Sequence, residues 1–232
     1  IALDASDKCL IIPAHAWTPW FSIFGAKSGF DSIEECFGPL SKYIYAIETG
    51  LSSDPIMNWR LSALDKITLL SNSDAHSPDK IGREANVFDC ELSYNNIYEI
   101  IKNKDTKKFL YTIEFFPEEG KYHYDGHRAC NILFSPSESK KHDGVCPVCK
   151  KKLTIGVLNR IEQLADRHEG YKNSSFIPYK NLVPLKEILA DVFDVGVDSK
   201  LVQREYDELI KKAETEFNVL LDLPLKKLSE IT

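Results

Sequence analysis

Residues 9–15, with the sequence CLIIPAH, and residues 67–76, with the sequence ITLLSNSDAH, each place a histidine after a strand-like apolar run. Short runs rich in isoleucine and leucine are typical of buried strands. In α/β folds, the polar groups that follow the carboxyl ends of parallel strands form the functional site. The two stretches therefore predict an α/β fold in which His15, Asp74 and His76 lie at the same edge of a sheet.

The same alternation of apolar runs and amphipathic segments continues to about residue 117. Such alternation predicts parallel strands joined by crossover helices, as in a (β/α) barrel or an open α/β sheet. The predicted strands cover residues 9–14, 43–48, 67–72 and 108–116, and the predicted helices cover residues 31–42, 57–66 and 93–103.

The composition is that of a globular protein, with 43% hydrophobic and 28% charged residues in a chain of 232. The net charge of −6 argues against a diffusely basic coat for nucleic acid, although basic residues can still cluster locally. No apolar run approaches the roughly 18 residues that a membrane helix needs, so no membrane partner is expected. With six cysteines and no secretory signal, we expect a reducing, cytoplasmic location.

Two pairs of metal-binding side chains lie in the Gly-, Lys- and Cys-rich part of the chain. His127 pairs with Cys130, and Cys146 pairs with Cys149, each pair separated by two residues. This spacing, with a ribbon-sized loop between the pairs, predicts a structural zinc site. His123 is the alternative to His127 as the fourth ligand.

The strand-end residues suggest a second metal site. In an extended Asp-x-His segment the two side chains share one face, so Asp74 and His76 can bind a metal together. Carboxylate and imidazole ligands suit Zn²⁺, Mn²⁺ or Fe²⁺. The alternatives are that His15 is a hydrogen-bonded core histidine and that Asp74 only stabilises a turn.

Several long stretches resemble the endonuclease Q family. PAH and SNSDAH look like the later metal motifs of PHP (polymerase and histidinol phosphatase) metallo-phosphoesterases. IPAHAWTPWFSIFG, ETGLSSDPIMNWR, SNSDAHSPDKIGREAN, TIEFFPEEGKYHYDGHRAC and CPVCKKKLTIGVLNRIEQLADR together are similar to endonuclease Q itself, and the similarity covers nearly the whole chain.

The resemblance implies a domain organisation and a ligand set. Residues 1–117 would be the C-terminal part of a distorted (β/α)7 PHP barrel, residues 118–155 a zinc-ribbon-like module and residues 156–232 a helical domain. His15, Asp74 and His76 would be catalytic ligands of Zn, Mn or Mg. The family's opening H-x-H motif and bridging glutamate are absent from this chain, which starts at Ile1 as though within a domain. We therefore expect the rest of the barrel to lie in a preceding N-terminal segment, and this fragment to be inactive without it.

The resemblance also implies an activity: hydrolysis of DNA on the 5′ side of deaminated bases, such as hypoxanthine and uracil, or of abasic sites. The partner would be damaged duplex or single-stranded DNA. Predicted DNA contacts are Trp17, Arg60, Arg83, Lys150 and Lys151, although a core tryptophan, ion-paired arginines and a solvated lysine rim are the simpler alternatives. Two other functions remain open: a PHP-type phosphatase for a small phosphomonoester, and a non-catalytic, zinc-stapled DNA-binding module.

Overall fold

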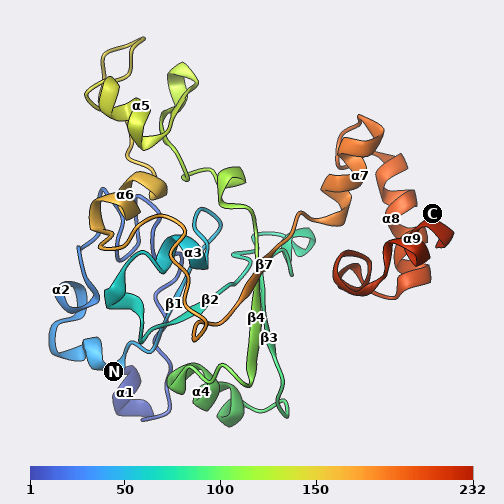
Figure 1. The fold of residues 1–232 in the computed structure, drawn as a ribbon, viewed down its shortest axis with the longest axis horizontal. Coiled ribbons are helices and arrows are strands. Elements are labelled where there is room, and N and C mark those ends of the chain that lie inside the picture. Colours follow the sequence, from blue (N-terminus) through green and yellow to red (C-terminus); the bar gives the residue numbers. More distant parts are fainter. Residues whose placement is uncertain (232) are drawn as a thin grey trace. The chain divides into compact units, whose positions relative to one another are not determined.

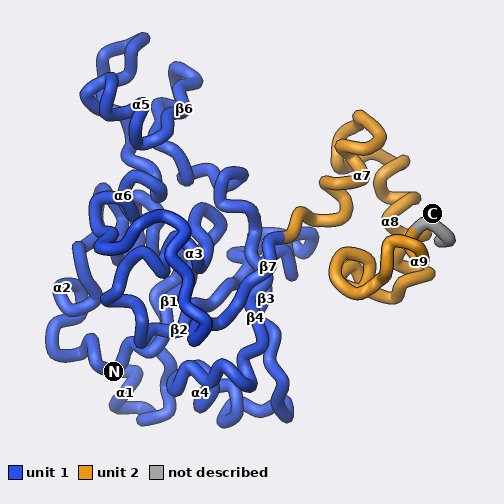
Figure 2. Tube along the Cα trace, in the orientation of Figure 1, with its two compact units in different colours: residues 1–181 blue, residues 182–232 orange. Residues whose placement is uncertain are grey.

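The computed structural model describes residues 1–231, and its chain divides into two compact units, residues 1–181 and 182–232 (Figure 2). The first unit is a mixed α/β structure and the second is helical (Figure 1). The predicted domain boundaries after residues 117 and 155 both fall inside the first unit. No described helix is long and apolar enough to cross a membrane.

The strands of residues 1–231 form three small sheets and no closed barrel. The first sheet pairs two strands in parallel, and the second places one antiparallel and one parallel strand beside a central strand. The third is an antiparallel hairpin. The sheets consist of β1 (Ala46–Glu48) with β2 (Thr68–Leu70), of β4 (Phe109–Glu114) between β3 (Ala85–Phe88) and β7 (Tyr179–Asn181), and of β5 (Asp125–His127) with β6 (Ile132–Phe134).

The helices of the first unit are short, and several begin at the side-chain caps that their sequences offer. Ser32 Oγ accepts a hydrogen bond from the Glu35 N–H at 3.0 Å, and Asp54 caps its helix in the same way. The helices are α1 (Ala2–Ala5), α2 (Ile33–Phe37), α3 (Pro55–Asn58), α4 (Tyr94–Asn103), α5 (Pro136–Lys141) and α6 (Val157–Leu164), with 3₁₀ turns at Gly38–Tyr43, Ser62–Leu64, Pro78–Lys80, Pro117–Glu119 and Arg128–Cys130.

Residues 9–14 do not form the strand that their composition predicts. They still lie along β1, because the Glu48 N–H donates to the Pro13 carbonyl and the Ala16 N–H donates to the Glu48 carbonyl, both at 3.0 Å. Pro13 has no N–H to donate, so a regular ladder cannot form through it. The segment therefore delivers His15 to the end of β1 without being a strand.

The carboxyl ends of β1, β2 and β4 meet at one edge. The Thr49 hydroxyl, just beyond β1, donates to Glu114 Oε2 at the end of β4 at 2.9 Å. The Ser71 hydroxyl, just beyond β2, donates to the carbonyl of Ile113 in β4. These buried bonds fix the strand-end edge on which the sequence places its polar residues.

The main core of the first unit joins the segment after His15 to α6. Trp17, Phe24, Ile47, Val157 and Ile161 are all nearly or fully buried in one cluster. The Trp17 and Phe24 rings pack with their centroids 4.6 Å apart. A second cluster packs α4 against β4. α6 therefore belongs to the core of this unit and holds the aromatic segment in place.

The second unit is a small helical domain. It contains α7 (Leu185–Phe193), α8 (Lys200–Ala213), a π-helical turn at Asn218–Asp222 and α9 (Leu225–Ile231). Leu185, Leu209, Ala213 and Val219 form its buried core. Ser199 caps α8 by accepting from the Val202 N–H at 3.2 Å, as expected for a serine at this position.

Candidate metal centres and nucleic-acid-binding surface

Four side chains of the β5–β6 module converge as a metal-binding set. One ligand atom from each of His127, Cys130, Cys146 and Cys149 lies within 4.8 Å of every other. A zinc–sulfur bond of about 2.3 Å in a tetrahedral site separates two sulfurs by about 3.8 Å, which fits within this cluster. Three thiolates and one imidazole are a donor set that zinc prefers. The cluster is therefore consistent with a structural zinc site.

The backbone around the second pair of cysteines is shaped to hold thiolates. Burial acts to raise the pKa of Cys146, but hydrogen bonds from the backbone N–H groups of Cys149 and Val148 outweigh it and lower that pKa. Burial and then hydrogen bonding with Cys149 raise the pKa of Cys130 to about 11, so the group does not deprotonate readily without a metal. Lys150 adopts a left-handed conformation with φ of 63° to close the turn.

His123 is not part of this cluster. Its side chain is 3% exposed, and its Nδ1 lies 3.1 Å from the Ser52 carbonyl oxygen. Burial lowers its pKa, so it is a neutral core histidine at pH 7. His127 is therefore the histidine that the structure brings to the three cysteines.

The strand-end residues His15, Asp74 and His76 lie in two loops at the β1–β2 edge. The His76 Nε2 lies 3.5 Å from Asp74 Oδ1, and both side chains are substantially exposed. Across residues 1–231, the Cys/His cluster is the one group that brings three or more ligand atoms within 4.8 Å of one another, so His15 is not gathered as tightly with the other two. Their assignment as metal ligands stays a prediction.

Both loops hold a candidate ligand in a strained backbone conformation. His15 has a φ of 30° and Asp74 a φ of 43°, a region that costs non-glycine residues energy. The Arg83 guanidinium donates from Nε to the Ser73 carbonyl at 2.9 Å and from Nη2 to the Asp74 carbonyl at 3.5 Å. Strain of this kind persists where surrounding contacts impose it, and it is frequent at functional sites.

Glu48 joins the two loops. Its Oε2 accepts from the His15 backbone N–H at 2.7 Å, and its Oε1 accepts from the Asn72 side chain at 2.8 Å. Asn86 extends the network by donating to Asn72 Oδ1 at 3.0 Å and accepting from the Ser71 N–H at 2.9 Å. The sequence places Glu48 at a strand end, but nothing in the pattern predicts the roles of Asn72 and Asn86.

Three buried carboxyl groups lie beneath this edge. Burial, and to a smaller extent the charge of the nearby Glu114, raises the pKa of Glu84 to about 9. Burial also raises the pKa of Glu114 to about 7 and that of Asp54 to about 6. The Oε2 of Glu84 has no hydrogen-bond partner. Glu84 is therefore protonated at pH 7, which removes the repulsion that two buried carboxylates would exert.

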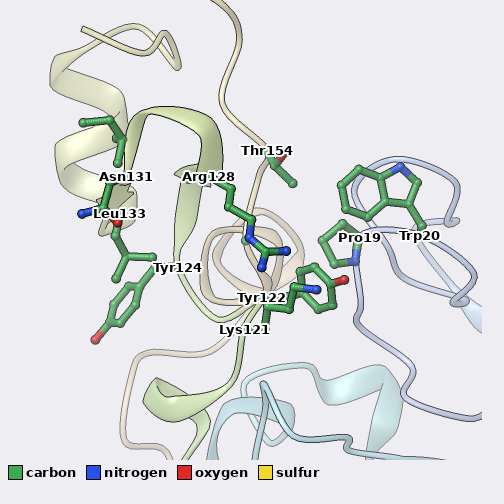
Figure 3. A pocket seen from close by; sticks show the side chains of 12 residues that line it. Pro19, Trp20, Lys121, Tyr122, Tyr124, Arg128, Asn131, Leu133 and Thr154 are labelled. Carbon is green, nitrogen blue, oxygen red and sulfur yellow. The ribbon is translucent and has the colours of Figure 1, made fainter. Parts of the chain in front are cut away.

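A cavity of about 490 Å³ opens between the aromatic segment after His15 and the β5–β6 module. In Figure 3 the Arg128 side chain lies between Tyr124 on one side and Pro19 and Trp20 on the other, with Lys121 and Tyr122 beside it. The Trp20 and Tyr122 rings meet edge to face with centroids 6.2 Å apart. Aromatic faces next to cationic side chains are suited to stacking bases and binding phosphates.

The residues predicted to contact DNA differ in accessibility. Trp17 is 1% exposed and donates from Nε1 to Asn58 Oδ1 at 2.7 Å, which argues against the predicted DNA contact and makes it a core residue. The Nε of Arg60 is likewise buried, without a hydrogen-bond partner. Lys150 and Lys151 are exposed next to the cysteine cluster. Within the aromatic segment, Trp20 and Phe21 are the exposed side chains, at 42% and 92%.

Comparison with solved structures gives a lesion-specific endonuclease as a neighbour of this fold. The structure superposes on PfuEndoQ from Pyrococcus furiosus with a TM-score of 0.84 and 33% sequence identity over 96% of this chain. The chain is similar to Endonuclease Q. A second solved structure, with the same similarity, is Endonuclease Q in complex with a 27-mer duplex substrate carrying an abasic lesion at the active site.

Sequence comparison gives two relatives and one family model. The chain is 33% identical over 227 residues to protein MJ0043 of Methanocaldococcus jannaschii and to protein YqxK of Bacillus subtilis, matching 94% and 96% of this chain. Residues 184–232 match the model of the MJ0043 C-terminal domain, which corresponds to the helical unit. The chain spans 27% of MJ0043, 53% of YqxK and 55% of PfuEndoQ.

Proposed function

We propose that this chain belongs to a metal-dependent endonuclease that cuts DNA on the 5′ side of deaminated bases or abasic sites. The observation that carries the proposal is the similarity to a lesion-specific endonuclease, at 33% identity and a TM-score of 0.84 over 96% of the chain. The chain would supply the C-terminal part of a PHP barrel, the zinc module at residues 118–155 and the helical region at residues 156–232. The opening barrel strands would come from a preceding segment.

His15, Asp74 and His76 would hold the catalytic metal ions, Zn, Mn or Mg. Their imidazole and carboxylate groups suit these metals, and Asp74 and His76 already lie side by side. Such metals lower the pKa of a bound water and stabilise the charge of the phosphodiester in the transition state. Three donors are too few for several ions, so further ligands would come from the preceding segment.

The chain's own residues would orient this site and bind the DNA. Glu48 and Asn72 connect the His15 loop to the Asp74 loop, and Arg83 holds the Asp74 backbone. The cavity lined by Trp20, Tyr122 and Arg128 would receive a nucleotide extruded from the duplex, because it combines ring faces with a cation. The Cys/His cluster would be a zinc staple that fixes the Arg128 wall of this cavity.

A strand-nicking assay tests the proposal. It uses the gene product that carries this chain at full natural length, a duplex with a single hypoxanthine, and an undamaged duplex of the same sequence. We expect nicking 5′ of the hypoxanthine that disappears in Asp74→Ala, while the exposed control Asp191→Ala keeps it. A small phosphomonoester is assayed in parallel, because phosphate release without nicking would favour the PHP-type phosphatase. Lesion binding without either activity would favour the non-catalytic module.

A further inference from the structure

Phe21 is the most exposed aromatic side chain of the first unit among those whose exposure the structure describes. It is 92% exposed, and its backbone φ of 57° lies in the left-handed region. A bulky residue with positive φ is an outlier, and an exposed phenylalanine gains nothing from burial. Neither feature helps the chain to fold, so both point to a role for this side chain outside the fold.

The backbone on both sides of Phe21 is fixed by buried contacts. Trp17 and Phe24, on either side of it in sequence, are each 1% exposed and pack on each other. The Phe24 N–H donates to the Ala16 carbonyl at 2.9 Å, and the Lys27 N–H donates to the Pro19 carbonyl at 3.0 Å. The Phe21 N–H itself donates to Ser28 Oγ at 3.2 Å. The strained conformation is therefore imposed by a rigid loop.

Tight packing at Gly25 adds to this rigidity. A Cβ placed on Gly25 would lie 2.3 Å from the Thr18 carbonyl oxygen, so no other residue fits there without a shift. The loop that carries Phe21 thus closes directly on the turn after His15. A side chain on such a frame keeps its position when it meets a ligand.

The loop also connects Phe21 to both candidate binding features. Thr18 Oγ1 lies 3.2 Å from His15 Nδ1, and it donates to the Trp20 carbonyl at 2.9 Å. Pro19 and Trp20, the two residues before Phe21, line the cavity. Lys27 is exposed on the same loop. The exposed Phe21 side chain therefore follows directly on two residues that line the cavity, in a loop that also contacts a predicted metal ligand and carries an exposed cation.

We propose that Phe21 is a wedge that enters the base stack of duplex DNA next to the lesion. Rigid apolar side chains inserted at a base step unstack it and bend the duplex. The nucleotide that leaves the stack would occupy the cavity, and the Phe21 ring would fill the space it vacates. This inference rests on the proposed function, and it adds a source of lesion selectivity, because a weakly paired base is cheaper to extrude.

If Phe21 acts as a wedge, its contribution to nicking depends on whether the DNA is single-stranded or duplex. Other roles of the side chain predict no such dependence. In single-stranded DNA there is no opposing stack to open, so Phe21 contributes little there. In a duplex with hypoxanthine paired to cytosine the stack must be opened, so Phe21 contributes most. A residue that only supports the fold would affect both substrates equally.

The test compares Phe21→Ala, Phe21→Gly and the control Leu92→Ala in the full-length protein. Leu92 is 89% exposed and lies outside the aromatic segment. We expect Phe21→Ala to lower the nicking rate on the hypoxanthine duplex by about tenfold, as for loss of one stacking contact, and to leave the rate on a single strand within about twofold. Phe21→Gly should lose duplex nicking equally while raising the melting temperature, because glycine tolerates the positive φ. Leu92→Ala should change neither rate.

A binding measurement tests the wedge role of Phe21 separately from the nuclease activity. In the Asp74→Ala background, a 2-aminopurine placed next to the lesion should brighten on binding, and Phe21→Ala should abolish the increase. If the wild type binds and brightens 2-aminopurine but nicks nothing, the endonuclease proposal fails and the wedge stands. Equal loss on both substrates, or no loss on either, overturns the wedge. If Phe21→Ala instead changes only the sedimentation of the protein, the side chain is a contact between protein chains.

Discussion

Glu48 accepts a hydrogen bond from the backbone N–H of His15, with 2.7 Å between N and Oε2. The same carboxylate accepts from Asn72 Nδ2 through its other oxygen. Glu48 therefore connects two loops that each carry a predicted metal ligand in a left-handed conformation. Each carboxylate oxygen accepts one of these hydrogen bonds, whereas an amide in the same place would turn its NH2 group, itself a donor, towards one of the two donors.

Glu48→Gln should loosen the strand-end site without unfolding the chain. The amide nitrogen of glutamine would face one of the two donors, so one link between the loops is lost. Outer-shell partners of metal ligands typically contribute about tenfold to a hundredfold in metal affinity, and we expect a loss of that size in Mn²⁺ affinity measured by calorimetry. Glu162→Gln, at an exposed position of α6, is the control that should leave the affinity unchanged. An unchanged affinity in Glu48→Gln would show that the link does not matter.

Glu84→Gln should stabilise the chain at alkaline pH. The folded-state pKa of Glu84, about 9, lies above its ordinary 4.5, so the folded chain holds the proton more tightly than the unfolded chain. The stability of the wild type therefore falls as the pH rises from about 4.5 towards about 9. Glutamine cannot ionise and escapes this loss. In denaturant unfolding at pH 8.5 we expect a gain of at least about 1 kcal/mol.

The pH profile decides whether this gain comes from the carboxyl group. The gain should shrink towards zero at pH 4, below the ordinary pKa of 4.5, because Glu84 is then protonated in the folded chain and mostly protonated in the unfolded chain. Glu208→Gln, at an exposed position of α8, should give no difference at either pH. A gain that is the same at both pH values would point to packing instead of ionisation.

The sequence predicts more of the metal chemistry than of the fold. His127 and Cys130, with Cys146 and Cys149, converge as their spacing predicts, because two-residue gaps act locally within tight turns. The position of the Asp74 loop after β2 was predictable because it follows an apolar run directly in the sequence. The strand predicted at residues 9–14 is absent because Pro13 interrupts pairing, and β3 at Ala85–Phe88 was missed because its run is short and flanked by polar residues.

The contacts between segments that lie far apart in the chain could not be predicted from the sequence. Trp17 and Trp20 are three residues apart in the same segment, yet one is 1% exposed and the other 42%, because α6 and Asn58 cover only the first. The links from Glu48 to Asn72 and from Thr49 to Glu114 join residues far apart in the chain. No local periodicity encodes such pairs.

Lys150→Gly should stabilise the zinc module. Lys150 has a φ of 63°, which glycine adopts without a Cβ clash, so we expect a gain of about 1 kcal/mol that appears as a higher melting temperature. Lys151→Gly is the matched control, because it removes the same charge from the next residue, whose φ is not positive. It should lower the melting temperature or leave it unchanged. Equal effects of the two variants would assign the change to charge and not to backbone strain.

Zinc should bind the Cys/His cluster stoichiometrically and hold the cavity wall in place. The four ligand atoms lie within 4.8 Å of one another, so we expect elemental analysis to find about one zinc ion per chain held at this cluster. Cys146→Ser should remove that ion and lower the melting temperature, because a serine hydroxyl at this fully buried position does not replace the thiolate ligand and the module loses its metal crosslink. Cys90→Ser, at a half-buried cysteine outside the cluster, should keep it. Arg128 lies between the ligands His127 and Cys130 in the sequence, so loss of zinc should also displace this side chain of the cavity. We therefore expect weaker binding to a lesion-containing single strand, measured by fluorescence anisotropy. Full zinc content in Cys146→Ser would exclude the cluster as the zinc site.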